Sequence, residues 1–300
     1  MSTPWPLPLR SGDRVRLAAA SSALDPAALE RLQAGVAELE SWGLQVDPHA
    51  EPLRRWGHLA GADGERRADL QGDGRPLPLL ACIRGGWGAA RLLEPAGAAT
   101  PPPGADARWL LGFSDVTSLL WARLAAGLGG GVHGPMLTSL AAEPDWSRQR
   151  LRDLLFGRSL PALPGEPWRG GVAEGPLLVG NLTVATHLLG TAHLPALQGA
   201  VLVLEDVGEA PYRIDRLLTH WRLCGALQQL AGIGFGRFSG CDDPDSPVAV
   251  DAVLRERTAD LGIPVLAGLA VGHEPGNAAL PLGVRARLDA DAGQLELLPD

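Results

Sequence analysis

Short apolar runs alternate with longer helix-like stretches through the first half of the chain. Residues 14–20, 79–83 and 109–112 are apolar runs of strand length. Asp25 and Pro26 open one of the helical stretches, because Asp is a good N-cap and Pro fits the first helical turn. Continuous apolar strands that alternate with helices are typical of a parallel sheet with both faces covered. The pattern therefore predicts an α/β fold with an open parallel sheet in this half.

The pattern is interrupted at residues 156–176, which are rich in Pro and Gly. Such a composition without an amphipathic period predicts a linker. Strand-like runs return after it, for example at residues 201–204 and 265–269. We therefore expect an N-terminal domain over residues 1–155 and a C-terminal domain over residues 177–300, with the ligand site in the cleft between them.

Composition excludes several classes of function. The 300 residues are 46% hydrophobic, which is enough for a large buried core. The net charge is −8 and the chain has no lysine, so a nucleic-acid partner, which needs clustered cations, is not expected. No apolar run is long enough to span a membrane and the first residues do not resemble a signal peptide, so we expect a cytoplasmic protein without a membrane partner. The three widely spaced cysteines predict reduced thiols.

Ser114 lies at the turn between a predicted strand and a predicted helix. A parallel sheet exposes functional groups at this position, the carboxyl end of a strand. The serine resembles the nucleophile elbow of hydrolases, although Val116 replaces the second glycine of G-x-S-x-G. N–H groups at the start of the following helix could stabilise negative charge there. The alternative is a helix cap, because a serine before Asp115 and an apolar run is ordinary capping chemistry.

A glycine-rich cluster at residues 84–88 (Arg-Gly-Gly-Trp-Gly) directly follows the predicted strand at residues 79–83. Glycines let the backbone approach a ligand closely and supply N–H donors. One interpretation is an oxyanion hole beside Ser114. The alternative, a dinucleotide site, is disfavoured because the spacing is G-G-x-G and Asp106 follows a Pro-rich loop instead of a strand. Cys82, within the strand, is expected to be a buried and inert thiol.

Glu205 and His273 follow predicted strands in the second half of the chain. Glu205 comes directly after an apolar run, and His273 stands in a Gly- and Pro-rich turn after another. Asp206 and Glu209 are rival acids, but we expect them in a turn with a solvated or capping role. A single histidine in such a turn is more often structural than catalytic. A serine hydrolase needs a nucleophile, an acid and a base, however, and the chain order Ser…Glu…His supplies all three at strand ends.

Patterns typical of a metal site are absent from the sequence, which has neither H-E-x-x-H nor paired His and carboxylate spacing. The acidic residues Asp242, Asp243 and Asp245 could hold a cation, but a solvated loop is the favoured interpretation. His49 and His58 lie in surface-like segments. We therefore expect neither a metal nor another cofactor.

Together these motifs resemble the LD-carboxypeptidases, serine peptidase family S66, which also includes the microcin C immunity hydrolases. The resemblance covers nearly the whole chain in order. The similar stretches are residues 9–13, 59–63 with Arg66, 84–88, 112–117, 133–136, 180–183, 189–191, 205–215, 272–273 and 280–283.

The resemblance implies roles for individual residues. It identifies Ser114 as the nucleophile, Glu205 as the acid and His273 as the base. It also assigns the oxyanion donors to the backbone N–H groups of Gly86 and Asp115.

The same resemblance implies a fold, a reaction and contacts with the substrate. The expected fold is an α/β N-terminal domain and a β-rich C-terminal domain, usually paired as a homodimer. The expected reaction removes the terminal D-alanine from a murein tetrapeptide during cytosolic peptidoglycan recycling. Gly85 competes with its neighbour as an oxyanion donor, and Arg84 is a candidate to bind the substrate carboxylate. Trp87 stands where the family commonly has tyrosine, so its contact with the substrate departs from the family pattern.

Two other functions stay open at this point. The chain could hydrolyse a peptidyl- or aminoacyl-nucleotide antibiotic, as the microcin C immunity branch does, with Trp87 or Trp168 stacking on the base. It could instead be a non-catalytic muropeptide-binding module. A binding module, however, has no need of Ser114, Glu205 and His273 together.

Overall fold

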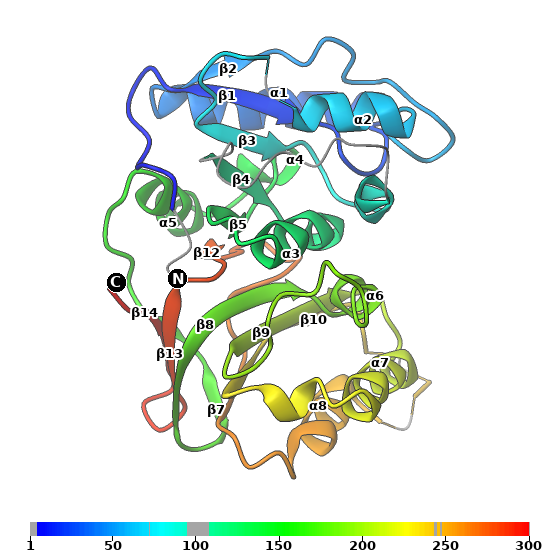
Figure 1. Cartoon of the computed structure of the whole chain (residues 1–300), viewed down its shortest axis with the longest axis vertical. Coiled ribbons are helices and arrows are strands. Elements are labelled where there is room, and N and C mark those ends of the chain that lie inside the picture. The colour runs from blue at the N-terminus through cyan, green and yellow to red at the C-terminus, as the bar shows by residue number, and fades with distance from the viewer. Residues whose placement is uncertain (1–4, 72, 95–107, 243–244, 247, 300) are drawn as a thin grey trace.

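The structure is a computed structural model that describes residues 5–71, 73–94, 108–242, 245–246 and 248–299. Its first sheet has the strand order β12-β5-β4-β3-β1-β2 (Figure 1). The pairs among β1 to β5 are parallel, whereas β12 runs antiparallel to β5. The strands are β1 (Arg14–Ala18), β2 (Gln45–Asp47), β3 (Leu79–Cys82), β4 (Trp109–Gly112), β5 (Gly131–His133) and β12 (Leu280–Pro281). Every residue of β3 and β4 is buried, which explains why both read as continuous apolar runs.

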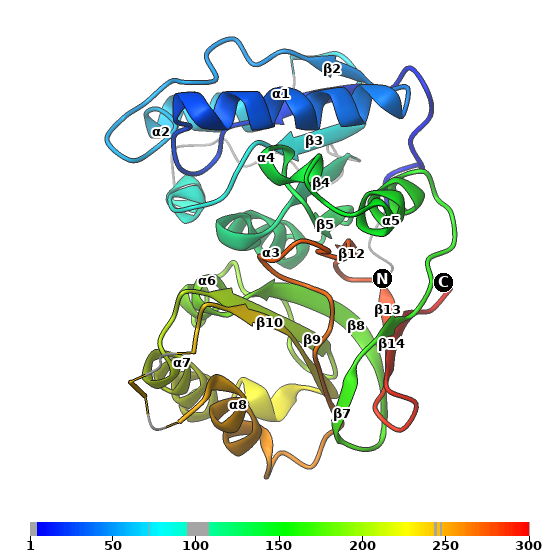
Figure 2. The ribbon, with the colours of Figure 1, turned by 180° about the vertical axis from the view of Figure 1, so that it is seen from behind.

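Helices cover both faces of this sheet. The helices α1, α4 and α5 lie on the face that is nearer the viewer in Figure 2, and α2 and α3 on the face that is nearer the viewer in Figure 1. The elements are α1 (Pro26–Ser41), α2 (Asp63–Leu70), the 3₁₀ helices η1 (Ala89–Leu93) and η2 (Ser114–Val116), α3 (Thr117–Ala125), α4 (Leu137–Leu140) and α5 (Asp145–Leu155). The Asp25 carboxylate accepts a hydrogen bond from the Ala28 amide at 2.7 Å, so the predicted cap of α1 is confirmed. Within the described ranges, no helix has both the length and the apolar character needed to cross a membrane.

The second sheet has the order β6-β14-β13-β8-β9-β10-β11-β7. Its centre, β8 to β11, is parallel, and antiparallel strands flank it on both sides. The strands are β6 (Leu163–Pro164), β7 (Glu166–Arg169), β8 (Val172–Asn181), β9 (Val201–Val207), β10 (Gly232–Ser239), β11 (Val265–Ala267), β13 (Arg285–Asp289) and β14 (Gln294–Leu297). The helices beside it are α6 (Leu182–His187), α7 (Pro211–Leu223), η3 (Leu227–Gln229) and α8 (Val250–Thr258). The predicted α/β class, with a parallel-rich first sheet and a β-rich second one, is confirmed.

Residues 156–176, predicted to be a linker, belong instead to the second sheet. Both β6 and β7 lie in this segment, and β8 begins within it at Val172. The strand β7 pairs with β11, with Pro167 opposite Leu266. The linker prediction was wrong because β6 and β7 are edge strands, where a proline without an N–H is tolerated.

The two sheets meet where α3 packs against the end of β8. The indole of Trp121 donates to the carbonyl of Val179 at 2.8 Å, and the Asn181 amide donates to the Thr117 hydroxyl at 3.0 Å. A Cβ on Gly180 would lie 2.6 Å from the Thr117 methyl carbon, so only glycine allows this close approach. By sequence β12 belongs to the predicted C-terminal domain, yet it completes the first sheet. The chain between β11 and β12 therefore passes from one sheet to the other, and this crossing carries His273.

Candidate active site

Ser114, His273 and Glu205 lie in hydrogen-bond contact, although 159 positions separate the first two in the chain. The Nε2 atom of His273 is 3.0 Å from the Ser114 hydroxyl, and its Nδ1 atom is 2.7 Å from a carboxylate oxygen of Glu205. A carboxylate accepts only from a protonated nitrogen, so the hydrogen-bond network assigns the proton to Nδ1. Nε2 is then free to accept the hydroxyl proton of Ser114. The structure thus brings the three expected side chains together in the arrangement of a nucleophile, a base and an orienting acid.

The backbone at Ser114 is strained. Its φ is +59°, and it is the one non-glycine residue in the described ranges with a positive φ. Such a left-handed residue between strand β4 and helix η2 is the geometry of a nucleophile elbow, which lifts the hydroxyl away from the sheet. The capping alternative is wrong, because the N-cap position of η2 is Phe113 and the Ser114 hydroxyl bonds to His273 instead. A Cβ on Gly112, the first glycine of the G-x-S-x-G pattern, would lie 2.6 Å from Val116. Glycine is therefore required at position 112 to make room for the valine that replaces the second glycine.

Glu205 is fully buried within β9, which continues beyond it to Val207. Glycines surround its side chain: a Cβ on Gly236 would lie 3.2 Å from the Glu205 Cβ, and one on Gly272 would lie 3.2 Å from the carboxylate oxygen that contacts His273. One carboxylate oxygen therefore accepts from the imidazole in a space closed by backbone. This enclosure holds the carboxylate in one orientation and shields it from water.

Glu205 also sets the protonation behaviour of His273. Burial alone would lower the pKa of the imidazole, but the hydrogen bond and negative charge of Glu205, with the charge of Asp206, outweigh burial and raise that pKa above 6.5. The imidazole is therefore a stronger base than a free histidine side chain. This is the direction that favours proton removal from a hydroxyl.

Asp206 and Glu209, the rival acids, do not contact His273 in the described hydrogen bonds. Asp206 was expected in a solvated turn, but it lies in β9 and is 2% exposed. Its carboxylate accepts from the Asn181 amide group (2.9 Å) and from the Thr183 hydroxyl (2.7 Å), so it joins β9 to the start of α6. Glu209 pairs with Arg213 at 3.4 Å, an ion pair in place of the solvated or capping role expected for it.

The glycine-rich loop after β3 lies against the nucleophile. A Cβ on Gly85 would be 3.0 Å from the Ser114 hydroxyl oxygen. Gly86 has a φ of +112°, and a Cβ there would lie 2.2 Å from the hydroxyl oxygen of Ser22. That hydroxyl accepts from the Trp87 amide at 3.0 Å, and the Ser22 amide donates to the Gly85 carbonyl at 3.3 Å. The loop is therefore fixed beside Ser114 in a conformation that requires glycine at both positions.

A second set of contacts joins this loop to the elbow. The buried Asp115 carboxylate accepts from the Ala89 amide at 2.8 Å. Burial raises the pKa of Asp115, and hydrogen bonds to the carboxylate partly offset that effect. The buried guanidinium of Arg66 donates to the carbonyls of Ala20 (2.5 Å) and Gly88 (2.8 Å). These contacts fix the distance between the glycine loop and the first turn of η2, where amide N–H groups have no acceptor within the helix.

Comparison with known proteins identifies the family. Family models for the LD-carboxypeptidase N-terminal and C-terminal domains match residues 15–134 and 174–288. The chain belongs to the LD-carboxypeptidase family. A protein of Synechocystis sp. with the provisional name of a carboxypeptidase is 47% identical over 98% of this chain and 97% of its own length. The murein tetrapeptide carboxypeptidase of Pseudomonas aeruginosa is 33% identical over 93% of this chain and 94% of its own length.

The fold of the chain also matches solved structures. MccF, the microcin C7 self-immunity protein, in complex with glutamyl sulfamoyl guanosine superposes with a TM-score of 0.85 over 99% of this chain and 98% of its own. The sequences are 21% identical, so the likeness concerns the fold alone. Escherichia coli is the source of the MccF relative that matches in sequence, at 31% identity over 40% of this chain.

The residues expected to contact the substrate differ in where they lie. The Arg84 guanidinium donates to the Ala23 carbonyl at 3.1 Å. Trp87 is 43% exposed, and its ring lies edge-on to His187 of α6, 6.0 Å between ring centres. Trp168 lies on β7, which both views place at the end of the second sheet away from the first (Figures 1 and 2). It packs against Phe235, so it does not suit the stacking role considered for it, whereas Trp87 is available to a ligand.

Other candidate groups of the chain fall outside the site. Burial raises the pKa of the Cys82 thiol to about 12, which agrees with an inert cysteine. Asp106 and Asp243 lie outside the described residues. Asp242 accepts from the Val250 amide at 2.9 Å and so caps the start of α8. Among the residues that the structure describes, no group of three or more His, Cys, Asp or Glu could hold a metal ion.

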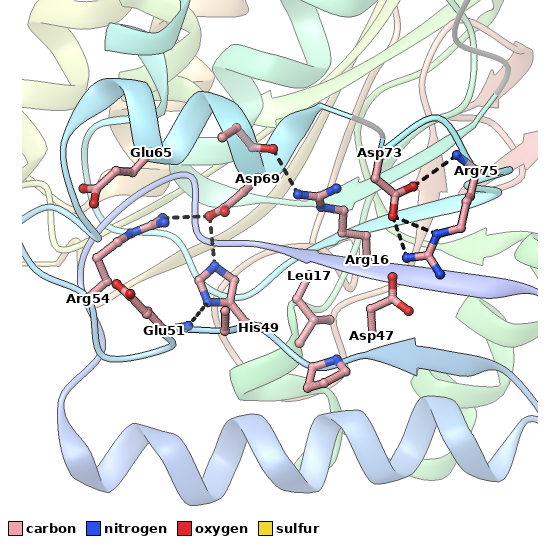
Figure 3. Close-up of a pocket in the computed structure, with 13 residues that line it drawn as sticks. Arg16, Leu17, Asp47, His49, Glu51, Arg54, Glu65, Asp69, Asp73 and Arg75 are labelled. Carbon is pink, nitrogen blue, oxygen red and sulfur yellow. Dashed lines mark hydrogen bonds and ion pairs between the residues drawn. The ribbon is translucent and has the colours of Figure 1, made fainter.

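A pocket of about 690 Å³ lies between α2, β1 and the end of β2 (Figure 3). It contains none of the three contacting side chains and no residue of the glycine loop. Its charged groups largely pair with one another: Asp69 accepts from His49 (3.0 Å) and Arg54 (2.8 Å), and Asp73 accepts from Arg75 (Figure 3). The prediction of a surface-like segment was wrong for His49, whose side chain is only 6% exposed.

Two aromatic residues beside the nucleophile were not expected from the sequence. The ring of Phe113 lies 4.9 Å from that of His273 and 5.6 Å from that of His133, measured between ring centres. His133 is fully buried at the end of β5, and burial, with the nearby charge of His273, lowers its pKa to about 3. It therefore stays neutral under ordinary conditions and does not compete with His273 as the base. Its place in a stretch similar to the family was the one signal in the sequence.

Proposed function

We propose that the protein is a serine LD-carboxypeptidase that removes the terminal D-alanine from murein tetrapeptides. The observation that carries the proposal is the unbroken contact from Ser114 through His273 to Glu205. Family membership supports it, as does the murein tetrapeptide carboxypeptidase of Pseudomonas aeruginosa, which aligns over nearly the whole chain.

Acylation begins at the hydroxyl of Ser114. His273 Nε2 takes the hydroxyl proton as the oxygen attacks the carbonyl carbon of the peptide bond before D-alanine. Glu205 stabilises the imidazolium that forms, through its 2.7 Å contact with Nδ1. Positioned general-base assistance of this kind typically contributes about 10²–10⁴-fold in rate.

The backbone N–H groups of Gly86 and Asp115 stabilise the oxyanion of the tetrahedral intermediate. Both flank the nucleophile, one in the glycine loop and one in the first turn of η2. Loss of a single such donor typically costs about 10²–10³-fold in turnover. The fixed positions of the loop and the turn mean that the donors are in place before the substrate binds.

Collapse of the intermediate completes the first half of the reaction. The carbon–nitrogen bond breaks, and His273 gives its proton to the departing amino group of D-alanine. A water molecule then attacks the acyl-enzyme, again with His273 as the base, and releases the shortened peptide and a protonated Ser114. The full cycle consumes one water molecule and leaves the enzyme unchanged.

The cellular setting is part of the same proposal. The protein acts in the cytoplasm in peptidoglycan recycling, on a small peptide substrate and as a homodimer. Light scattering coupled to gel filtration tests the dimer independently of activity. A mass equal to one chain across the working concentration range would contradict it.

Product analysis by mass spectrometry tests the reaction. Purified protein should convert murein tetrapeptide to tripeptide and free D-alanine, and should leave a tetrapeptide ending in L-alanine intact. Ser114→Ala should reduce turnover by about 10⁶-fold while it leaves the fold unchanged. Release of D-alanine by Ser114→Ala at the wild-type rate would refute the nucleophile assignment.

The same assay separates the alternatives. An aminoacyl-adenylate analogue offered beside the tetrapeptide identifies a nucleotide-peptide hydrolase if only the analogue is cleaved. Binding of tetrapeptide without any cleavage identifies a muropeptide-binding module. Either result would replace the proposed activity.

A further inference from the structure

The loop that carries His273 is closed at its base by its own hydrogen bonds. The amide of Ala278 donates to the carbonyl of Ala270 at 2.7 Å. The side chain of Asn277 accepts from the Gly272 amide at 3.1 Å, directly beside His273. Asn277 is 1% exposed, so this contact is shielded from water. The position of His273 therefore depends on where residues 276–278 are held.

Glu143 holds those residues from the side of the molecule that contains the first sheet. It lies between α4 and α5 and is 8% exposed. A single carboxylate oxygen accepts from the amides of Gly276 (2.7 Å) and Asn277 (3.0 Å). The hydroxyl of Ser147, one helical turn further on, donates to the Asn277 carbonyl at 2.9 Å. Three hydrogen bonds thus fasten the His273 loop to the segment that packs on the first sheet.

The carboxylate of Glu143 has no cationic partner among the ion pairs of the described residues. Its buried oxygen is instead satisfied by the two backbone N–H groups that donate to it. Gly276, one of the donors, has a φ of +91°, and a Cβ there would lie 2.8 Å from the Trp146 ring. A side chain at position 276 would therefore push the loop away from α5.

The geometry points to Glu143 as a positioning residue for the base of the reaction. It holds residues 272–277 so that the imidazole stays between Ser114 and Glu205. A shift of this loop would also disturb the acid, because the Gly272 backbone lies against the Glu205 carboxylate. The inference rests on the proposed function only in that His273 is taken as the base. Misplacement of a catalytic group by about 1 Å costs on the order of 10²-fold in rate.

Three variants test this role. Glu143→Ala removes the acceptor, Glu143→Gln retains an acceptor oxygen of similar reach, and Asp145→Ala removes a neighbouring carboxylate. Asp145 is the matched control because its side chain is 95% exposed and, among the residues that the structure describes, forms its ion pair with Arg148. Each variant is compared with wild type for kcat and KM on tetrapeptide and for the rate at which a fluorophosphonate labels Ser114. Labelling reports on the reactivity of the hydroxyl and does not depend on the identity of the natural substrate.

We expect Glu143→Ala to lower kcat and the labelling rate by about 10- to 100-fold with KM little changed. Glu143→Gln should restore most of both, and Asp145→Ala should behave as wild type. Proton NMR supplies a readout that a purely structural role would not move. The Nδ1 proton of His273, which bonds to Glu205, is expected to give a sharp downfield resonance in the wild type. This resonance should broaden in folded Glu143→Ala and return in Glu143→Gln.

Two results would overturn the inference. One is a folded Glu143→Ala that labels at the wild-type rate with a sharp Nδ1 resonance, because Glu143 would then contribute to stability alone. The other is a Glu143→Gln as impaired as Glu143→Ala, because the charge and not the acceptor would then matter. If wild type releases no D-alanine, the proposed function fails, but the NMR comparison still decides whether Glu143 positions His273.

Discussion

The backbone of Gly85 lies directly against the side chain of Ser114. A Cβ added at Gly85 would stand 3.0 Å from both the Cβ and the hydroxyl oxygen of the serine. The hydroxyl is at the same time 3.0 Å from His273, so it has no room to move away without losing its base. Glycine at position 85 therefore leaves room for the Ser114 hydroxyl to stay in contact with His273, and it also allows the shape of the loop.

Gly85→Ala should therefore lower kcat/KM by about 10²-fold, because the methyl group displaces the hydroxyl from His273. Steady-state kinetics on tetrapeptide measure the effect. Gly64→Ala is the matched control, since Gly64 lies in α2 and a Cβ there meets nothing within 4 Å. That variant should keep full activity and gain up to about 1 kcal/mol in unfolding free energy from helix propensity. Equal values of kcat/KM for Gly85→Ala and Gly64→Ala would mean that the loop shifts to accommodate the methyl group at position 85.

The pH dependence of kcat/KM should have an acid limb set by His273. The protonated imidazole cannot accept the Ser114 proton, so activity falls as pH drops through the raised pKa of His273, above 6.5. Glu205→Gln removes the charge that raises this pKa and leaves burial, which lowers it, so the residual activity should have its acid limb at lower pH. Measurement of kcat/KM between pH 5 and 9 for both proteins tests the sign. An acid limb that stays in place in Glu205→Gln would show that another group sets it.

The fold could be predicted where local pattern and tertiary packing agree. The strand β4 and the start of α1 at Asp25 follow from an apolar run and a capping residue. The edge strands β6 and β7 could not be predicted, because proline and glycine suit an edge strand and a linker equally well. The return of β12 to the first sheet also has no local signal, since β12 consists of Leu280 and Pro281 alone and its pairing with β5 depends on the whole fold.

The candidate site divides in the same way. Ser114, Glu205 and His273 could be proposed because each follows an apolar run and the family order links them. Glu143 gave no signal, because its partners are backbone amides 133 and 134 positions away, which carry no sequence code. Asp206 was assigned to a turn because the apolar run ends before it. The strand nevertheless continues through Asp206, because its buried carboxylate accepts a hydrogen bond from the Asn181 side chain.

Asp115 should matter for both stability and turnover. Asp115→Ala leaves the Ala89 amide without its acceptor in a buried setting, which costs about 1–3 kcal/mol of unfolding free energy. The glycine loop is then less well fixed beside the elbow, so kcat should fall more than KM rises. Asp115→Asn keeps an acceptor oxygen and should recover most of both. Chemical denaturation and steady-state kinetics on the three proteins measure the two effects, and full activity in a folded Asp115→Ala would show that the contacts of Ser22 and Arg66 fix the loop without Asp115.

His133 should make the protein sensitive to acid. Its pKa is about 3 in the folded state, compared with 6.5 for a free histidine. Burial is the larger cause of this lowered pKa, and the charge of His273 is the smaller one. Between pH 3 and pH 6.5 the unfolded chain therefore binds a proton at His133 that the folded chain does not bind. The contribution of neutral His133 to the unfolding free energy is complete above pH 6.5 and is lost as the pH falls toward 3. The slope is about 1.4 kcal/mol per pH unit within that window.

His133→Leu removes this proton-linked term and the two ring nitrogens that lack a hydrogen-bond partner within the described residues. Its unfolding free energy should fall less than that of the wild type between pH 6.5 and 4. His220→Leu is the matched control, because His220 is exposed on α7 and the same substitution there should leave the wild-type pH dependence in place. Urea denaturation at several pH values measures all three proteins. If the unfolding free energies of wild type and His133→Leu changed in parallel with pH, His133 would be protonated equally in the folded and unfolded states. That result would contradict the prediction.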